Sequence, residues 1–135
     1  MYLSSSDIFH LIDSKYLIIK GTNGYEFSPQ EQVGPCSVDI RLANEFRKFK
    51  STQAVIDLLD ISTISKMQEN LEVFYEKHVL DEGESISIEP NEVVLAYALE
   101  YIELPTMVAA ILTGRSRFAR LGISINCTGD FINPG

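Results

Sequence analysis

Short segments of alternating or apolar residues, separated by turns rich in glycine and proline, constrain the fold of this chain most. Residues 37–42 and 85–88 alternate between apolar and polar side chains, as expected of half-buried strands. Residues 93–104 form a longer apolar run that ends at Pro105 and predicts one long strand. Many short strands with few helices are typical of an all-β barrel or sandwich.

The remaining segments fit a small β protein. Further strands are expected over residues 17–19, 46–49, 54–59, 73–80, 108–112 and 123–125. Ser4–Ser6 and Asp7 form a helix N-cap pattern, and Ile8, Leu11 and Ile12 then share one face, so a short first helix is expected. Residues 64–78 also have helical spacing, and we favour a second helix over 65–70 followed by the strand. Turns are predicted over 21–35 and 81–84. Without repeats or linkers, the 135 residues predict a single domain.

Composition narrows the function classes. The hydrophobic content of 45% and the charged content of 22% are ordinary for a soluble globular protein, and the net charge is −8. An acidic chain is not expected to bind nucleic acid or an anionic membrane non-specifically. The sequence shows neither a signal peptide nor an apolar run of bilayer length, so we expect a cytoplasmic protein. Cys36 and Cys127 are expected to be reduced thiols, and no cysteine cluster suggests zinc.

Residues 114–122, with the sequence GRSRFARLG, stand out in this acidic chain. Arg115, Arg117 and Arg120 gather with Ser116 beside a predicted helix start. Guanidinium groups bind phosphate oxygens in pairs, and helix N-termini add N–H donors. The segment therefore predicts a phosphate-bearing small molecule as ligand. The alternative is a solvated basic turn with surface ion pairs.

The same segment carries a resemblance to a known family. GRSRFARLG resembles the nucleotide motif of the dCTP deaminase branch of the trimeric dUTPase-like superfamily. Other elements of that family are matched in order by SVDIRL at 37–42 with EFR at 45–47, VLDEGE at 79–84, ELP at 103–105 and FINPG at 131–135. The resemblance implies a mainly β fold, a distorted jelly-roll β-barrel with a short N-terminal helix and a short helix at the nucleotide motif.

The resemblance also implies a function. Enzymes of this branch form homotrimers with active sites between subunits, and bind a pyrimidine deoxynucleoside triphosphate (dCTP or dUTP) with Mg²⁺ held through the triphosphate. They hydrolyse the C4 amine of dCTP to give dUTP and ammonia, without zinc. Carried onto this chain, the catalytic residues would be Ser116 and Arg120. The substrate-binding residues would be Arg115, Ser116, Arg117, Arg120, Asn126, Cys127, Thr128, Gly129 and Asn133.

Roles follow for individual side chains. Arg115 would bind the triphosphate, and Ser116 would donate to phosphate or hold the attacking water. Arg120, one helical turn after Ser116, would stabilise developing negative charge. The loop from Asn126 to Gly129 would read the edge of the pyrimidine with its backbone.

The chain departs from the family pattern at three places. Arg117 replaces the second serine of the motif, and Asn133 replaces an aspartate that is catalytic in the dUTPase branch. The general-base glutamate of the deaminases lies in the strand after the Pro-Gly element, and no glutamate of residues 1–135 occupies that place. We therefore expect the C-terminal strands and tail of the family to be missing, and the printed chain to be inactive.

Other interpretations remain open. One is a dUTP diphosphatase or a bifunctional deaminase and diphosphatase, and another is a non-catalytic nucleotide-binding module. His10 and His78 are isolated and are not expected to be catalytic. The acidic turn over 81–84 is expected to be solvated rather than metal-binding. Asp39 and Arg41 are expected to form a structural pair across strands or at an interface, rather than to be catalytic.

Overall fold

The computed structural model describes residues 2–50, 59, 65, 72, 74–126 and 129–135. It contains two compact units, one formed by Met1–Ile40 with Leu99–Gly135 and the other by Arg41–Ala98. All paired strands are antiparallel, and the helices are short, which confirms the mainly β prediction. The assignment of one domain stays a prediction. None of the helices in the described part of the chain is long and apolar enough to cross a membrane.

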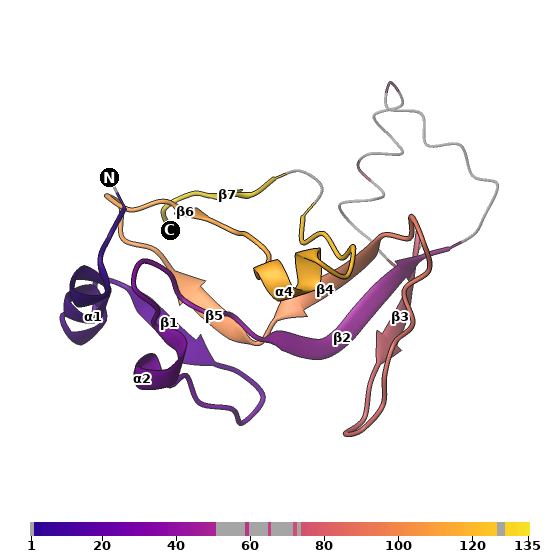
Figure 1. The fold of residues 1–135 in the computed structure, drawn as a ribbon, viewed down its shortest axis with the longest axis horizontal. Coiled ribbons are helices and arrows are strands. Elements are labelled where there is room, and N and C mark those ends of the chain that lie inside the picture. The colour runs from indigo at the N-terminus through magenta and orange to yellow at the C-terminus, as the bar shows by residue number, and fades with distance from the viewer. Residues whose placement is uncertain (1, 51–58, 60–64, 66–71, 73, 127–128) are drawn as a thin grey trace. The chain divides into compact units, whose positions relative to one another are not determined.

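The first unit combines three helices with two small sheets (Figure 1). Its elements are α1 (Ser5–Asp13), β1 (Ile18–Gly21), α2 (Pro29–Gln32), β5 (Glu100–Glu103), β6 (Ala110–Ile111), α4 (Ser116–Ala119) and β7 (Phe131–Ile132). Strand β1 pairs with β5, and β6 pairs with β7. These pairings join segments that lie far apart in the sequence.

Helix α1 begins as the N-cap pattern predicts. The Ser4 backbone N–H donates to the Asp7 carboxylate at 2.9 Å, and the Asp7 N–H donates to Ser4 Oγ at 3.3 Å, which completes a capping box. The side-chain hydrogen bond with Ser4 holds the pKa of Asp7 below its usual value, and the backbone hydrogen bond from Ser4 adds to the shift. The first helix is therefore confirmed, and the local capping box at its start is joined by a hydrogen bond from the Ser5 N–H to the Pro35 carbonyl oxygen at 2.8 Å.

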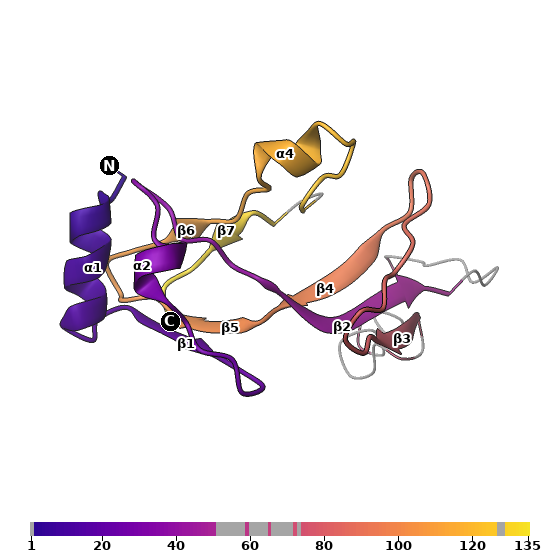
Figure 2. The same ribbon diagram turned by 60° about the horizontal axis from the view of Figure 1, so that its bottom comes forward.

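The core of this unit is small. Ile8 of α1 packs with Leu17 and Leu104, and each of the three side chains is at least nine-tenths buried. Figure 2 shows α1 beside the start of β1, which is how Ile8 and Leu17 meet. Half-buried apolar side chains surround this cluster: Leu3, Leu11, Ile12, Ile19, Val33, Val38, Ile102 and Ala110. The core thus joins α1 to β1 and β5, and it reaches β6 through Ala110.

In the second unit, the described residues form one sheet of three strands, in the order β3–β2–β4 (Figure 1). These strands are β2 (Leu42–Phe49), β3 (Tyr75–Val79) and β4 (Val94–Ala98). Phe74 is buried, and Phe49 meets the Tyr75 ring edge to face with ring centroids 5.3 Å apart. The predicted strands over 46–49 and 73–80 are confirmed in β2 and β3.

Several predicted strands are wrong. Residues 37–42 form no strand before Leu42, apart from a single bridge between Val38 and Val33. Residues 85–88 and 123–125 are irregular. The long strand predicted over 93–104 is divided at Leu99, whose carbonyl oxygen accepts from both the N–H and the hydroxyl of Thr22. A distant partner, rather than a local breaker, therefore ends β4.

Other differences concern lengths and helices. The predicted strand over 108–112 is reduced to β6, and α2 lies within a stretch predicted to be turns only. The turn over 81–84 is confirmed, with the Glu84 N–H donating to the Asp81 carbonyl oxygen at 3.0 Å. The predictions over 54–59 and 65–70 lie outside the described residues except at Leu59 and Ser65.

Candidate functional site

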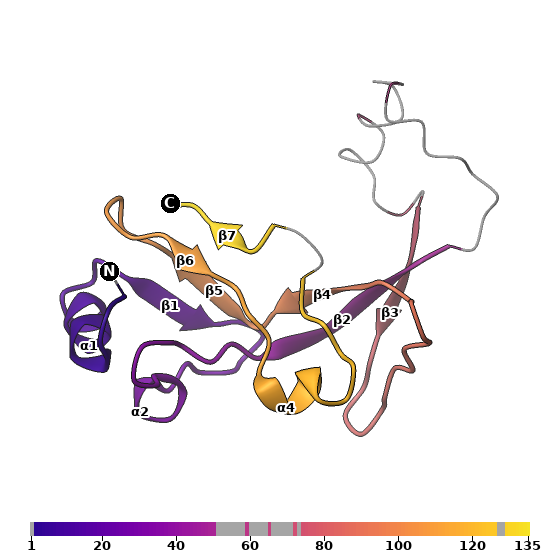
Figure 3. The same ribbon diagram turned by 45° about the horizontal axis from the view of Figure 1, so that its top comes forward.

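The arginine segment belongs to a loop that is closed at its base by backbone pairing. Beyond the β6–β7 pairs, the Leu112 N–H donates to the Asp130 carbonyl oxygen at 2.8 Å. Asn126 Nδ2 donates to the Leu112 carbonyl oxygen at 2.9 Å. Figure 3 shows α4 within the chain that leaves β6 and returns to β7. The two ends of the loop are therefore held together by the β6–β7 pairing and the contacts of Leu112.

Packing favours glycine at the start of the segment. A Cβ atom at Gly114 would lie 2.9 Å from Cγ1 and 3.3 Å from Cβ of Ile125. At the other end, Gly122 has a φ of 80° and ends the turn that follows α4, a conformation that glycine adopts without strain. Both ends of GRSRFARLG are thus fixed by the backbone of this loop.

Helix α4 is a single turn. Arg115 is its N-cap residue, with extended backbone angles and no side-chain cap, and the Arg120 N–H donates to the Ser116 carbonyl oxygen at 3.1 Å. Arg120 therefore lies one turn after Ser116, as predicted. A helix of four residues aligns few peptide dipoles, so the positive charge here comes from the guanidinium groups.

The three arginines of the segment are exposed but differ in their contacts. Arg115 Nη2 donates to the carboxylate of Asp39, which lies 76 positions earlier in the sequence. The guanidinium carbon of Arg117 lies 4.8 Å from the centroid of the Phe118 ring. No ion pair to Arg120 forms within the described ranges. Among the contacts between described residues, Arg115 is thus the one of the three held by a distant part of the unit.

The predicted pyrimidine loop is described in part. Asn126 has a φ of 54° and Gly129 a φ of 78°, so the backbone turns sharply on both sides of Cys127 and Thr128, which lie outside the described residues. Asn126 Oδ1 is buried and has no hydrogen-bond donor among the described residues. Asn133 lies exposed after β7. The structure brings Arg115, Ser116 and Arg120 onto one segment, which the base of the loop joins to Asn126.

Sequence reasoning missed the partner of Arg115. Asp39 was expected to form a structural pair across strands or at an interface, and the structure shows its carboxylate against Arg115. No local pattern announces this contact, because it joins segments 76 positions apart. The contact follows from the fold, which brings Asp39 close to the arginine segment, and the wrong strand prediction over 37–42 placed Asp39 elsewhere.

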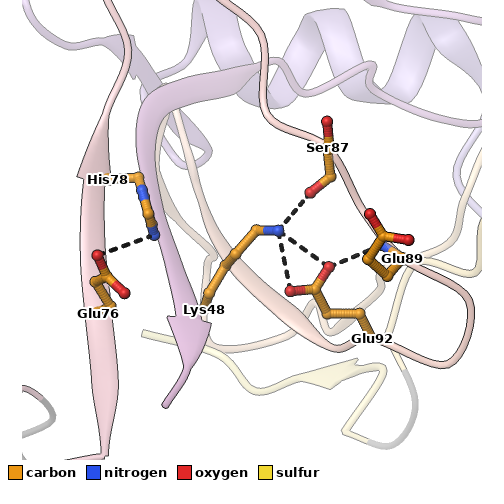
Figure 4. Close-up of polar contacts among 6 residues, drawn as sticks. All are labelled: Lys48, Glu76, His78, Ser87, Glu89 and Glu92. Carbon is orange, nitrogen blue, oxygen red and sulfur yellow. Dashed lines mark hydrogen bonds and ion pairs between the residues drawn. The ribbon is translucent and has the colours of Figure 1, made fainter. Parts of the chain in front are cut away.

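The second unit has its own charged cluster, which Figure 4 shows. Lys48 Nζ lies 3.0 Å from the Glu92 carboxylate and also donates to the Ser87 carbonyl oxygen. The Glu89 N–H, and after it Lys48, holds the pKa of Glu92 below its usual value. His78 Nε2 lies 4.0 Å from the Glu76 carboxylate. This cluster closes the loop between β3 and β4 and resembles no catalytic arrangement.

Metal ligands are scattered in this structure. No group of three or more His, Cys, Asp or Glu side chains within the described residues could hold a metal ion. The chain's own groups suited to an anionic ligand are the guanidiniums.

Sequence comparison decides the family. A family model described as dCTP deaminase-like matches residues 2–135. The chain belongs to the dCTP deaminase-like family. Two relatives of this member carry the name dCTP deaminase, dUMP-forming. The protein from Nanoarchaeum equitans is 38% identical over 142 residues, and the protein from Dictyoglomus turgidum is 34% identical over 136 residues.

Coverage is unequal in these comparisons. The matches take in the whole of this chain, but 68% of the Nanoarchaeum protein and 64% of the Dictyoglomus protein, so the chain spans about two thirds of their length. The crystal structure of 2′-deoxycytidine 5′-triphosphate deaminase from Agrobacterium tumefaciens superposes with a TM-score of 0.62 at 21% identity. The superposition covers 99% of this chain and 37% of the Agrobacterium chain, and it supports the dUTPase-like fold.

Proposed function

We propose that this family member binds dCTP and serves its hydrolytic deamination to dUTP and ammonia. One observation carries the proposal: in a chain of this family, Arg115, Ser116 and Arg120 lie on one short segment that is anchored at both ends. The relatives named dUMP-forming support a second candidate, a bifunctional enzyme that also releases diphosphate. Asn133, where the dUTPase branch has an aspartate, weighs against a pure dUTP diphosphatase.

The side chains would divide the work between binding and chemistry. Arg115 uses one guanidinium nitrogen on Asp39, which leaves its other N–H donors for phosphate oxygens. The Ser116 hydroxyl would donate to phosphate or hold the attacking water, and Arg120 would stabilise negative charge that develops during attack. Asn126, Cys127, Thr128 and Gly129 would form the pyrimidine loop with Asn133 nearby. A magnesium ion, when bound, would neutralise triphosphate charge.

The position of Arg117 supports a lesser role in phosphate binding. Its guanidinium lies over the Phe118 ring. The family has a serine hydroxyl at this position, and this chain has none there. Stacked arginine can still contact an anion with its edge. We therefore propose that Arg115 supplies the main phosphate contact and Arg117 a weaker one.

Deamination also needs a general base. The resemblance places that glutamate in the strand after Pro134 and Gly135, so residues 1–135 are expected to bind dCTP and to release no ammonia. The homotrimer, the Mg²⁺ ion carried on the triphosphate and the cytoplasmic location remain predictions from the resemblance and the sequence.

Binding and turnover test the proposal separately. Titration calorimetry with dCTP and dUTP measures affinity, while ammonia and diphosphate release report the two reactions. Arg115→Ala removes a charge-assisted contact of about 1.5–3 kcal/mol, so dCTP affinity should fall by roughly 10- to 100-fold. Lys20→Ala removes one exposed positive charge from β1 of the same unit and should change it little.

The outcomes separate the candidate functions. Binding of dCTP without chemistry, even in a protein that carries the strand after Gly135, would select the non-catalytic module. Diphosphate release from dUTP without deamination of dCTP would select the diphosphatase. Equal losses in Arg115→Ala and Lys20→Ala would show that the arginine segment is not the phosphate site.

A further inference from the structure

A buried polar pair lies in the first unit, outside the arginine segment. Gln32, the last residue of α2, is 7% exposed, and Glu100, the first residue of β5, is 5% exposed. Gln32 Nε2 donates to Glu100 Oε1 at 2.9 Å across 68 positions of sequence. Removing a carboxylate from water is costly unless strong hydrogen bonds replace hydration, so this pair calls for a reason.

Gln32 grips the backbone of Asp39 at two points. The Asp39 N–H donates to the Gln32 carbonyl oxygen at 2.8 Å, and Gln32 Nε2 donates to the Asp39 carbonyl oxygen at 2.9 Å. Gln32 Oε1 accepts from the Ser28 N–H at 3.0 Å. Both hydrogens of the amide nitrogen are therefore used, one on Glu100 and one on Asp39, and the amide cannot rotate without losing all three contacts.

Asp39 in turn holds Arg115. Its carboxylate accepts from Arg115 Nη2, although both side chains are about half exposed (42% and 56%). An exposed ion pair between two free side chains contributes little and is poorly fixed in direction. Here one partner stands on a backbone that Gln32 clamps, so the direction of the guanidinium is set from inside the unit.

We propose that Gln32 and Glu100 are positioning residues for Arg115. Glu100 fixes the Gln32 amide, Gln32 fixes the Asp39 backbone, and the Asp39 carboxylate presents the guanidinium to a triphosphate group. This inference rests on the proposed function, because it gives Arg115 a phosphate to bind. Pre-ordering Arg115 lowers the entropy lost when an anion binds, since fewer side-chain rotamers remain to be frozen.

The first test needs no ligand. In the full protein, the ¹⁵N order parameter of the Arg115 Nε–H is measured by NMR for the wild type and for Gln32→Met, which keeps length but loses the amide. The order parameter should fall clearly in Gln32→Met. Thr22→Val, which removes a hydroxyl bond to the Leu99 carbonyl in the same unit, is the matched control and should leave it unchanged. An unchanged value in Gln32→Met, or an equal fall in Thr22→Val, overturns the proposal.

The second test uses a double-mutant cycle with inorganic tripolyphosphate and dCTP as probes. Gln32→Met should weaken binding at least fivefold in the wild type and less than 1.5-fold in an Arg115→Ala background, because its effect passes through Arg115. Equal losses in both backgrounds would mean a general structural effect and would contradict the proposal. If Gln32→Met does not fold, Glu100→Gln replaces it. A neutral acceptor bonds Gln32 less strongly, so the order parameter should fall in the same direction but less, and no fall refutes the role of Glu100.

Failure of the proposed function is a separate result. If the wild type binds neither tripolyphosphate nor dCTP, the nucleotide function is wrong, while the order parameter of Arg115 still decides whether Gln32 positions it. If the wild type binds both and the cycle is additive, the nucleotide function stands and the positioning role is wrong.

Discussion

Replacing Gly114 by alanine tests whether the start of the arginine segment is fixed by packing. The new Cβ atom would lie 2.9 Å from Ile125 Cγ1 and 3.3 Å from Ile125 Cβ. Carbon atoms in contact are usually about 3.5–4.0 Å apart, so the shortfall reaches about 1 Å. Ile125 is branched at Cβ and has few alternative rotamers, so it cannot simply swing away.

The cost can be bounded from the surroundings. Overpacking typically costs about 1–3 kcal/mol. Because Ile125 is 37% exposed, part of the strain can be released toward solvent, and we expect the lower end, about 1 kcal/mol. For a chain of this length that corresponds to a fall in melting temperature of roughly 3–5 °C. Since Gly114 immediately precedes Arg115, a shift of the backbone there would move the Arg115 side chain away from its preferred rotamer. We therefore expect dCTP affinity to fall as well, by about threefold or more.

The assay pairs thermal unfolding with calorimetry of dCTP binding. Ile125→Ala in the Gly114→Ala background removes the 2.9 Å contact and should restore at least half of both losses. Gly83→Ala is the matched control: its φ of 88° is strained for alanine, but a Cβ there meets nothing within 4 Å. It should cost about 1 kcal/mol of stability and leave dCTP affinity unchanged. Wild-type affinity in Gly114→Ala, or no rescue by Ile125→Ala, would refute the packing argument.

Two further predictions concern contacts away from the loop. Ser4→Ala removes the capping box of α1 and should lower the stability of the first unit by about 1 kcal/mol, seen as a lower urea midpoint; an unchanged midpoint would mean that the cap is replaced by water. The hydrogen bond from Lys77, and then that from Arg47, holds the pKa of Glu45 below its usual value. The contribution of Glu45 to stability is therefore present above about pH 4.5 and is lost as pH falls further. Glu45→Gln should therefore make the melting temperature depend less on pH between pH 5 and pH 3. A slope equal to that of the wild type would show that the pair with Lys77 is not formed.

The parts of the fold that were correctly predicted depend on neighbours in sequence. The capping box of α1 joins Ser4 to Asp7, and the turn at 81–84 is closed by its own first and last residues. The one-turn spacing between Ser116 and Arg120 is equally local. Such contacts are encoded within four residues, so a single sequence displays them completely.

The incorrect predictions share the opposite cause. The apolar run over 93–104 continues through Leu99 without a breaker, yet Thr22, 77 positions earlier, binds the Leu99 carbonyl and the strand ends there. Alternation over 37–42 predicted a strand, but Gln32 takes both backbone groups of Asp39 that a ladder would have used. The local pattern indicates a propensity for strand, and hydrogen bonds from distant residues determine whether and where the strand forms.

The two arginines on either side of Ser116 show how this distinction bears on the site. Arg117, the residue that departs from the family motif, lies against Phe118, its immediate neighbour, so this contact is made within the helix. Arg115 is held by Asp39, which Gln32 fixes from the buried side of the unit. A substitution at position 117 can therefore be absorbed within α4, whereas a change at Gln32 would reach Arg115 without touching the motif. Under the proposed function, the motif indicates which residues would meet the phosphate, and the proposed positioning contacts would determine how well Arg115 is oriented.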